Sequence, residues 1–287
     1  KMGKIDAVGL VFPVHPVPLN NSVFMDMVGE ISHELARHEI DLLLIADDDL
    51  ADKHSYMRMV QSRRVDALIV AHTLDHDPRL VQLQAAGFPF LALGRSQLPQ
   101  PYAWFDFDNY AGTCRATRHL IQQGHTRIGY LCSNHSISDA EDRLRGYYDA
   151  LRENGLPCND RLVAYGEPDE SGGEQAMTEL LGRGRNFTAV ASYNDSMAAG
   201  AMGVLNDNGI EVPAEISLIG FDDVLVSRYV RPRLTTVRYP IVTMATQAAE
   251  LALALAEKRQ PPDITHLFSP TLVRRHSVIA PSESDKS

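Results

Sequence analysis

The sequence predicts an α/β fold in which two lobes each contain a doubly wound parallel sheet. Short apolar runs recur along the chain, and stretches with helical spacing of apolar residues separate them. This alternation is typical of parallel sheets that helices cover on both faces. The chain has 287 residues and 44% hydrophobic content, which is too long for one compact core and apolar enough to fill two.

The predicted strands are short runs of apolar residues, as expected for parallel strands that are buried on both faces. In chain order they cover residues 7–12, 42–46, 67–70, 88–93, 103–107, 128–131, 189–192 and 217–221. Between the fourth and fifth runs the pattern loosens into a proline-containing segment, which predicts an irregular link.

Helices are predicted between these runs. Apolar residues three and four positions apart give residues 24–35 and 244–255 one apolar face each. Gly155 and Gly209 each follow an asparagine and precede an apolar residue, which predicts helix ends in the left-handed conformation. Two capping boxes predict helix starts, formed by Ser138 with Glu141 and by Ser171 with Glu174.

Charge and cysteine content limit the classes of function. The formal net charge of −10 lacks the basic footprint that binding to nucleic acid phosphates requires. Cys114, Cys132 and Cys158 are an odd number without disulfide or zinc spacing, so we expect a reducing compartment, the cytoplasm. The longest apolar runs, such as residues 42–46, are far shorter than the ~20 residues that cross a bilayer, so we expect no membrane partner.

Motifs for catalysis or cofactor binding are lacking. No phosphate-binding loop occurs, and the glycines of residues 182–184 lack a preceding strand. His72 and His76 are four apart, but without the glutamate of the zinc-protease pattern they indicate a solvated surface. We therefore expect no cofactor, no metal and no enzymatic activity, although paired carboxylates of a hydrolase need no local motif.

Several strings between Thr117 and Val278 are specific to one family. Among them are Gly124-His125-Thr126-Arg127, Arg143-Leu144-Arg145-Gly146, Asn194-Asp195, Gly220-Phe221-Asp222-Asp223 and Arg274-Arg275-His276. In this order and spacing they resemble the effector-binding core of the lactose and galactose repressor (LacI/GalR) family. Before Thr117 the resemblance is weaker but keeps the family framework.

The resemblance implies a fold like that of type I periplasmic binding proteins. The N-terminal lobe would comprise residues 4–123 plus 240–268, and the C-terminal lobe residues 124–239 plus 269–279. The family's proteins begin with a DNA-binding headpiece of the helix-turn-helix type. Because this sequence starts directly at the first predicted strand, we expect the headpiece to be absent from this chain.

The resemblance also implies ligand contacts, which we expect in loops beyond the carboxyl ends of the strands. The planar fork of Arg143 suits vicinal oxygens, although a surface ion pair with a neighbouring carboxylate is the alternative. Asp222 can accept two hydroxyl protons, or it can form a turn at the strand end. Asn194 can donate to and accept from one hydroxyl, but the sequence fits a helix N-cap equally well.

Weaker candidates for the ligand site come from both lobes. Phe24 would offer an apolar face to a sugar ring, although an aromatic residue at helical spacing often belongs to the core. The others are expected at the mouth of the site, and they are Asn21, Asp108, Pro168, Tyr239 and Ile241.

We therefore expect a sugar-responsive transcriptional repressor. A small, galactose-like sugar would bind between the lobes and change operator affinity through its preference for one lobe arrangement. The expected partners are a second copy, paired through residues 22–37 and 241–257, and operator DNA bound by the missing headpiece. The alternative is a periplasmic sugar-binding protein of a transporter or chemoreceptor.

Overall fold

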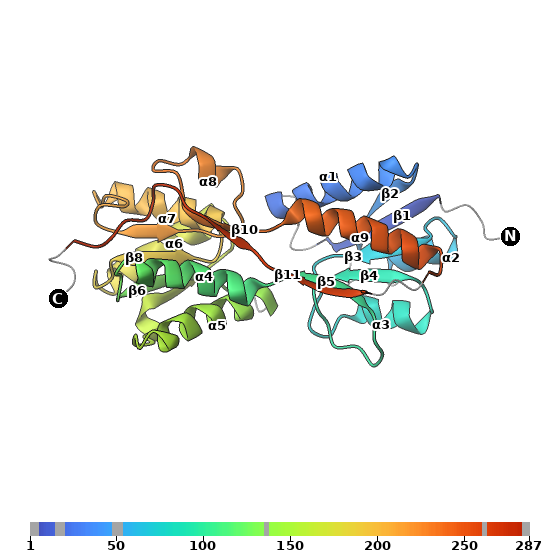
Figure 1. The fold of residues 1–287 in the computed structure, drawn as a ribbon, viewed down its shortest axis with the longest axis horizontal. Helices are drawn as coiled ribbons and strands as arrows, with labels where there is room; N and C mark the ends of the chain where they lie inside the picture. Colours follow the sequence, from blue (N-terminus) through green and yellow to red (C-terminus); the bar gives the residue numbers. More distant parts are fainter. Residues whose placement is uncertain (1–5, 15–20, 48–53, 135–137, 260–262, 283–287) are drawn as a thin grey trace. The chain divides into compact units, whose positions relative to one another are not determined.

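The structure is a computed structural model and describes residues 6–14, 21–47, 54–134, 138–259 and 263–282. The chain forms two compact units. One comprises Lys1–Phe107 with Pro240–Phe268, and the other comprises Asp108–Tyr239 with Ser269–Ser287. Each unit contains a parallel sheet with helices packed on it (Figure 1), so the predicted fold class is confirmed.

The first unit is built on a six-stranded parallel sheet in the order β11-β5-β4-β3-β1-β2. Its strands are β1 (Ala7–Pro13), β2 (Asp41–Asp47), β3 (Ala67–Val70), β4 (Phe90–Leu93), β5 (Ala103–Phe107) and β11 (Thr265–Phe268). Side chains alternate across β1, so that Leu10 belongs to one core and Val11 to another. The sheet is therefore covered on both faces.

Two pairs of helices provide that cover. Helices α1 (Ser22–Arg37) and α9 (Ile241–Ala256) contribute to the core that contains Leu10. Helices α2 (Ser55–Gln61) and α3 (Pro78–Ala85) contribute to the core that contains Val11. The helical spacing predicted for residues 24–35 and 244–255 is confirmed.

The second unit contains a four-stranded parallel sheet in the order β7-β6-β8-β9 and a separate antiparallel pair, β10 with β12. Helix α6 packs against α7, and α4 packs against α5. The strands are β6 (Ile128–Ser133), β7 (Val163–Gly166), β8 (Ala189–Ser192), β9 (Ser217–Ile219), β10 (Thr236–Arg238) and β12 (Thr271–Val273). The helices are α4 (Asn109–Gln122), α5 (Ser138–Glu153), η2 (Asp160–Leu162), α6 (Glu170–Gly182), α7 (Asp195–Asp207) and α8 (Val226–Tyr229).

The boundary between the units differs in one place from the sequence-based expectation. The chain first leaves the first unit after Phe107, before α4, rather than near Gly124. Two glycines hold α4 in the second unit by close packing. A Cβ on Gly112 would lie 2.5 Å from the Phe221 ring, and one on Gly146 would lie 2.5 Å from the carbonyl of Tyr110.

Some local predictions hold and others need correction. Gly155 and Gly209 both have φ of +69° just beyond α5 and α7, which confirms the predicted helix ends. The predicted capping box at Ser171 is wrong, because Asp169 caps α6 and accepts a hydrogen bond of 2.8 Å from the Gly172 amide. The side chain of Ser138 lies outside the described residues.

The expectation that every strand is buried is wrong for β2. This strand lies at the edge of its sheet, and Leu44 is 48% exposed. Strands β4 and β9 are also shorter than predicted, since β4 begins at Phe90 and β9 ends at Ile219.

Candidate functional site

The strand order of the second unit indicates where on its sheet a ligand would bind. The chain runs from β6 to β7 on one side and then to β8 on the other side of β6. In an open parallel sheet such a reversal leaves a crevice at the carboxyl ends of the two central strands, where ligands bind. Helix α5 follows β6, and Tyr193 and Asn194 follow β8.

Arg143 of α5 is the centre of the polar contacts in this region and is only 4% exposed. Its Nε donates to Asn109 Oδ1 at 2.9 Å. Its Nη2 donates to the Tyr239 hydroxyl at 2.6 Å and to Asp222 Oδ1 at 3.3 Å, and its Nη1 donates to the Tyr193 carbonyl. The alternative interpretation, a surface ion pair, is therefore wrong for Arg143.

Aromatic rings enclose the same guanidinium group. Its Cζ lies 4.0 Å from the centre of the Phe221 ring and 4.3 Å from that of Tyr193, distances at which a cation is attracted to the ring face. Burial would lower the pKa of Arg143, but Tyr239 and Asp222 nearby raise it well above its ordinary value. The second unit therefore contains a buried, permanently charged cation.

Asp222 lies just after β9, where its backbone has φ of +102° and its amide donates to the Val237 carbonyl at 2.8 Å. Its side chain is 13% exposed. Burial raises the pKa of Asp222 to about 6, an effect that Arg143 opposes and Asp139 adds to. The carboxylate is thus ionised at neutral pH and becomes protonated in mildly acidic solution.

Asn194 caps α7, as the sequence allowed. Its Oδ1 accepts from the Met197 amide at 2.8 Å, and its Nδ2 donates to the Pro168 carbonyl at 2.8 Å. The structure therefore brings Asn194 and Pro168 together. One lone pair on Oδ1 and one proton on Nδ2 of Asn194 are not used by these two bonds.

Of the remaining candidates in the second unit, the structure brings Tyr239 to Arg143 but not Asp108. The Tyr239 hydroxyl donates to Asn109 Oδ1 at 2.5 Å. Asp108 caps α4, where its carboxylate accepts from the Ala111 amide at 2.9 Å.

The candidates in the first unit have structural roles. Asn21 caps α1 and accepts from the Phe24 amide at 3.1 Å. Phe24 is 6% exposed and packs against Phe12, with ring centres 5.6 Å apart. Ile241 begins α9 and packs on the core. Phe24 therefore belongs to the core rather than to an open aromatic face.

Sequence reasoning missed Asp139, which lies one helical turn before Arg143. Its Oδ2 accepts from the Tyr193 hydroxyl at 2.8 Å. Its Oδ1 is buried without a hydrogen-bond partner among the residues that the structure describes. The spacing of four residues, which places two side chains on one helix face, is the signal that identifies it.

Other residues of the sequence motifs that resemble the family support the backbone around the site. Buried Asp195 accepts from the Thr236 hydroxyl at 2.6 Å and from the Val224 amide at 2.9 Å. A Cβ on Gly220 would lie 2.1 Å from the Asp195 carboxylate, so only glycine fits there.

Two further motifs, around Asp223 and around His125, form hydrogen bonds that stabilise the second unit. Burial opposes ionisation of Asp223, but hydrogen bonds from Arg275 and Arg238 hold its pKa below the ordinary value. The His125 ring lies 2.8 Å from the Thr188 hydroxyl and 2.9 Å from the Ile279 carbonyl. These residues of the family-like motifs therefore have structural roles and are not ligand contacts in this account.

Across the described ranges no three His, Cys, Asp or Glu side chains are grouped so as to hold a metal ion. In the same ranges no helix is long and apolar enough to span a membrane. Cys114 and Cys132 are buried free thiols, and Cys158 is an exposed one.

The two parallel-sheet units define a protein of the periplasmic-binding-protein-like class. A family model described as periplasmic binding proteins and sugar binding domain of the LacI family matches residues 5–257. The chain belongs to this family.

Individual relatives agree with this assignment. The chain is 65% identical over 263 residues to the HTH-type transcriptional regulator GalR of Escherichia coli K12, which covers 90% of this chain and 76% of that protein. A LacI-family regulatory protein from Chloroflexus aggregans superposes with a TM-score of 0.86 at 29% identity, over 94% of this chain and 98% of its own. The transcriptional regulator CelR in complex with cellobiose gives a TM-score of 0.85 at 26% identity, over 96% of this chain and 85% of its own.

Arg143→Ala is expected to lower the free energy of unfolding by about 3–5 kcal/mol, because it removes a buried cation and leaves the largely buried Asp222 carboxylate without its partner. Arg145→Ala is the matched control on the same helix. The Arg145 side chain is 60% exposed and pairs with Asp142 at 2.7 Å, so its loss should cost less than about 1 kcal/mol. Urea unfolding measures both, and equal stability losses would contradict the central position of Arg143.

Proposed function

We propose that this chain is the effector-binding core of a sugar-responsive transcriptional repressor. The observation that supports it most is the buried, charged Arg143 beside the carboxylates of Asp222 and Asp139 at the carboxyl edge of the second sheet. The family membership and the regulators among the relatives support the same function.

The chemistry of this group favours a neutral ligand with several hydroxyls. A carboxylate accepts hydroxyl protons, and a guanidinium group donates to hydroxyl oxygens. Because two carboxylates stand beside one cation, a phosphate group would meet net repulsion there. We therefore propose that the ligand is a small, galactose-like sugar. Its polar contacts in the second unit would be Arg143, Asp222, Asp139 and the remaining donor and acceptor of the Asn194 amide.

The output of sugar binding is a switch rather than a reaction. A bound sugar changes operator affinity only if it prefers one conformation of the protein. A hundredfold change in operator occupancy requires only about 2.7 kcal/mol of coupling, which a few hydroxyl contacts supply. Operator DNA would be bound by a helix-turn-helix headpiece, as the name of the E. coli relative indicates, and the protein would act in the cytoplasm.

In this proposal the weaker candidates, Asn21, Phe24, Asp108, Pro168, Tyr239 and Ile241, make no polar contact with the sugar. Asn21 and Asp108 cap helices, Phe24 and Ile241 pack in the core, and the Pro168 carbonyl accepts from Asn194. Tyr239 orients Arg143 through its hydroxyl. Tyr239 is therefore a positioning residue in this proposal.

Two alternatives have different consequences. A periplasmic sugar-binding protein would share the fold, but a relative with 65% identity is a transcriptional regulator. An enzyme would convert the sugar, so recovery of unchanged sugar after long incubation would argue against it.

A homodimer is part of the proposal, formed through α1 and α9. Met25 on α1 is 41% exposed and Val242 on α9 is 59% exposed, which leaves apolar side chains for a partner to cover. Sedimentation velocity should show a dimer at micromolar concentration, and a monomer at high concentration would contradict this arrangement.

Galactose should bind the protein in calorimetry, and Asp222→Asn should weaken that binding about tenfold or more, since a charge-assisted hydrogen bond contributes about 1.5–3 kcal/mol. Asparagine tolerates the positive φ at this position, so the fold should be retained. Asp142→Asn is the control, because its carboxylate has the same 13% side-chain exposure but pairs with Arg145. Equal affinities of the two variants would contradict the role of Asp222.

Sugar affinity should also fall as the solution becomes acidic. With a pKa of about 6, most of Asp222 is ionised at pH 7 and about a tenth at pH 5, so binding that requires the carboxylate weakens about tenfold over this range. Calorimetry at several pH values measures the slope. Asp222→Asn should remove it, and an unchanged slope in that variant would assign the pH dependence to another group.

A further inference from the structure

Asp195 joins the two segments of the second unit that carry Asn194 and Asp222. It is the first residue of α7, directly after Asn194, and it is fully buried. Its backbone amide donates to the Phe221 carbonyl at 2.8 Å, and Phe221 directly precedes Asp222. One backbone hydrogen bond therefore connects the neighbours of two proposed sugar contacts.

The Asp195 side chain adds bonds on the other side of Asp222. Its Oδ2 accepts from the Val224 amide at 2.9 Å, and its Oδ1 accepts from the Thr236 hydroxyl at 2.6 Å. Thr236 is the first residue of β10. The chain that follows β8, the chain that follows β9 and the start of β10 are thus all held by one buried residue.

The backbone at Asp222 and Asp223 needs such support, because the two φ angles are +102° and +57°. Residues other than glycine seldom adopt these values, and such a backbone persists only where surrounding contacts hold it. Hydrogen bonds from Arg238 and Arg275 hold the Asp223 carboxylate. The bonds of Asp195 hold the chain immediately before and after this pair.

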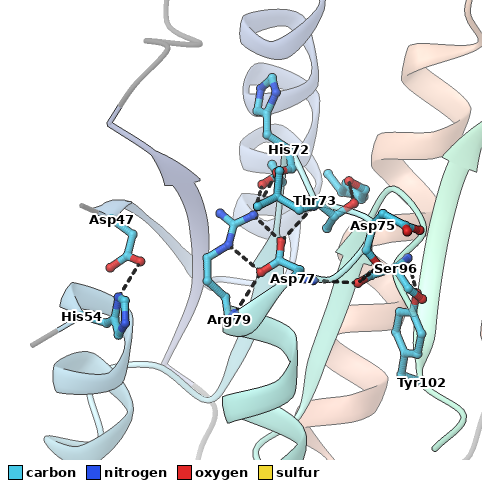
Figure 2. Close-up of polar contacts among 12 residues, drawn as sticks. Asp47, His54, His72, Thr73, Asp75, Asp77, Arg79, Ser96 and Tyr102 are labelled. Carbon is cyan, nitrogen blue, oxygen red and sulfur yellow. Dashed lines mark hydrogen bonds and ion pairs between the residues drawn. The ribbon is translucent and has the colours of Figure 1, made fainter. Parts of the chain in front are cut away.

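Figure 2 shows a buried carboxylate of the first unit with a more local effect. Asp77 accepts from the Leu74 amide at 3.1 Å and from Arg79 Nη2 at 2.7 Å, and both partners lie within three residues of it. These bonds shape a single loop. The two side-chain partners of Asp195 are 29 and 41 residues away, so its bonds fix separate segments relative to one another.

We infer that Asp195 is a positioning residue of the sugar site, which holds the Asp222 carboxylate beside Arg143 and at a fixed separation from Asn194. This inference rests on the proposed function. Asp195 makes no contact with the sugar itself, because it is fully buried and both of its carboxylate oxygens already accept hydrogen bonds. A ligand whose hydroxyls bind both Asp222 and Asn194 requires that separation to be constant.

The first test compares two substitutions of the same residue. Asp195→Ala should weaken galactose binding about tenfold in calorimetry, because the contact that Asp222 makes is lost. Asp195→Asn should retain most of the affinity, since asparagine keeps an oxygen for the Val224 amide and offers an N–H to the Thr236 oxygen. Equal losses in the two folded variants would overturn the inference.

A double-mutant cycle separates positioning from a general structural role. In the Asp222→Asn background, Asp195→Ala should weaken galactose binding less than about twofold, because the carboxylate that Asp195 positions is already gone. A residue that only stabilises the fold would weaken binding by the same factor in both backgrounds. Additive effects would therefore overturn the inference.

A matched pair of threonines tests the same contact with smaller changes. Thr236 and Thr188 are both buried, and each hydroxyl bonds to one buried side chain, that of Asp195 or that of His125. Thr236→Val should weaken galactose binding about threefold, and Thr188→Val should leave it unchanged, with thermal unfolding showing that both variants are folded.

The outcomes distinguish this inference from the proposed function. Unchanged galactose affinity in folded Thr236→Val, or an equal loss in both threonine variants, would overturn the positioning role of Asp195 alone. Failure of the unmodified protein to bind any sugar would overturn it together with the proposed function.

Discussion

The second unit depends on keeping a charged guanidinium group inside a protein core. Arg143 is retained there because Asn109, Tyr193, Asp222 and Tyr239 supply its acceptors, and because aromatic rings cover its faces. Arg143 lies on α5, and these partners come from α4 and the segments after β8, β9 and β10. One buried charge therefore holds together the segments at the carboxyl ends of the strands. The same charge can donate hydrogen bonds to hydroxyl groups there.

The central strands and long helices were predictable from the sequence, whereas the edges of the sheets were not. Runs such as residues 67–70 are apolar throughout because both of their faces are buried. By contrast, β7 contains the half-exposed Tyr165, and β11 is exposed at most positions, so these strands at the sheet edges are not buried on both faces. The assignment of α4 to the second unit depends on close approach at Gly112 and Gly146, which no periodicity reveals.

For the candidate site, residue type and family position identified Arg143, Asp222 and Asn194, but not what each side chain contacts. The N-cap bond of Asn194 was anticipated by local chemistry because both partners lie within one turn. The bonds of Arg143 join residues far apart in the chain, from Asn109 to Tyr239, so only the fold brings them together. The sequence relates His72 only to His76, four residues away, whereas its contact with the Phe24 ring appears only in three dimensions.

The most direct test of the account is a crystal structure of the protein with galactose bound. The account predicts sugar hydroxyls within hydrogen-bond distance, about 2.7–3.2 Å, of the Arg143 guanidinium group and the Asp222 carboxylate. A sugar molecule bound elsewhere, with the Arg143 contacts unchanged and no ligand atom near Asp222, would contradict it.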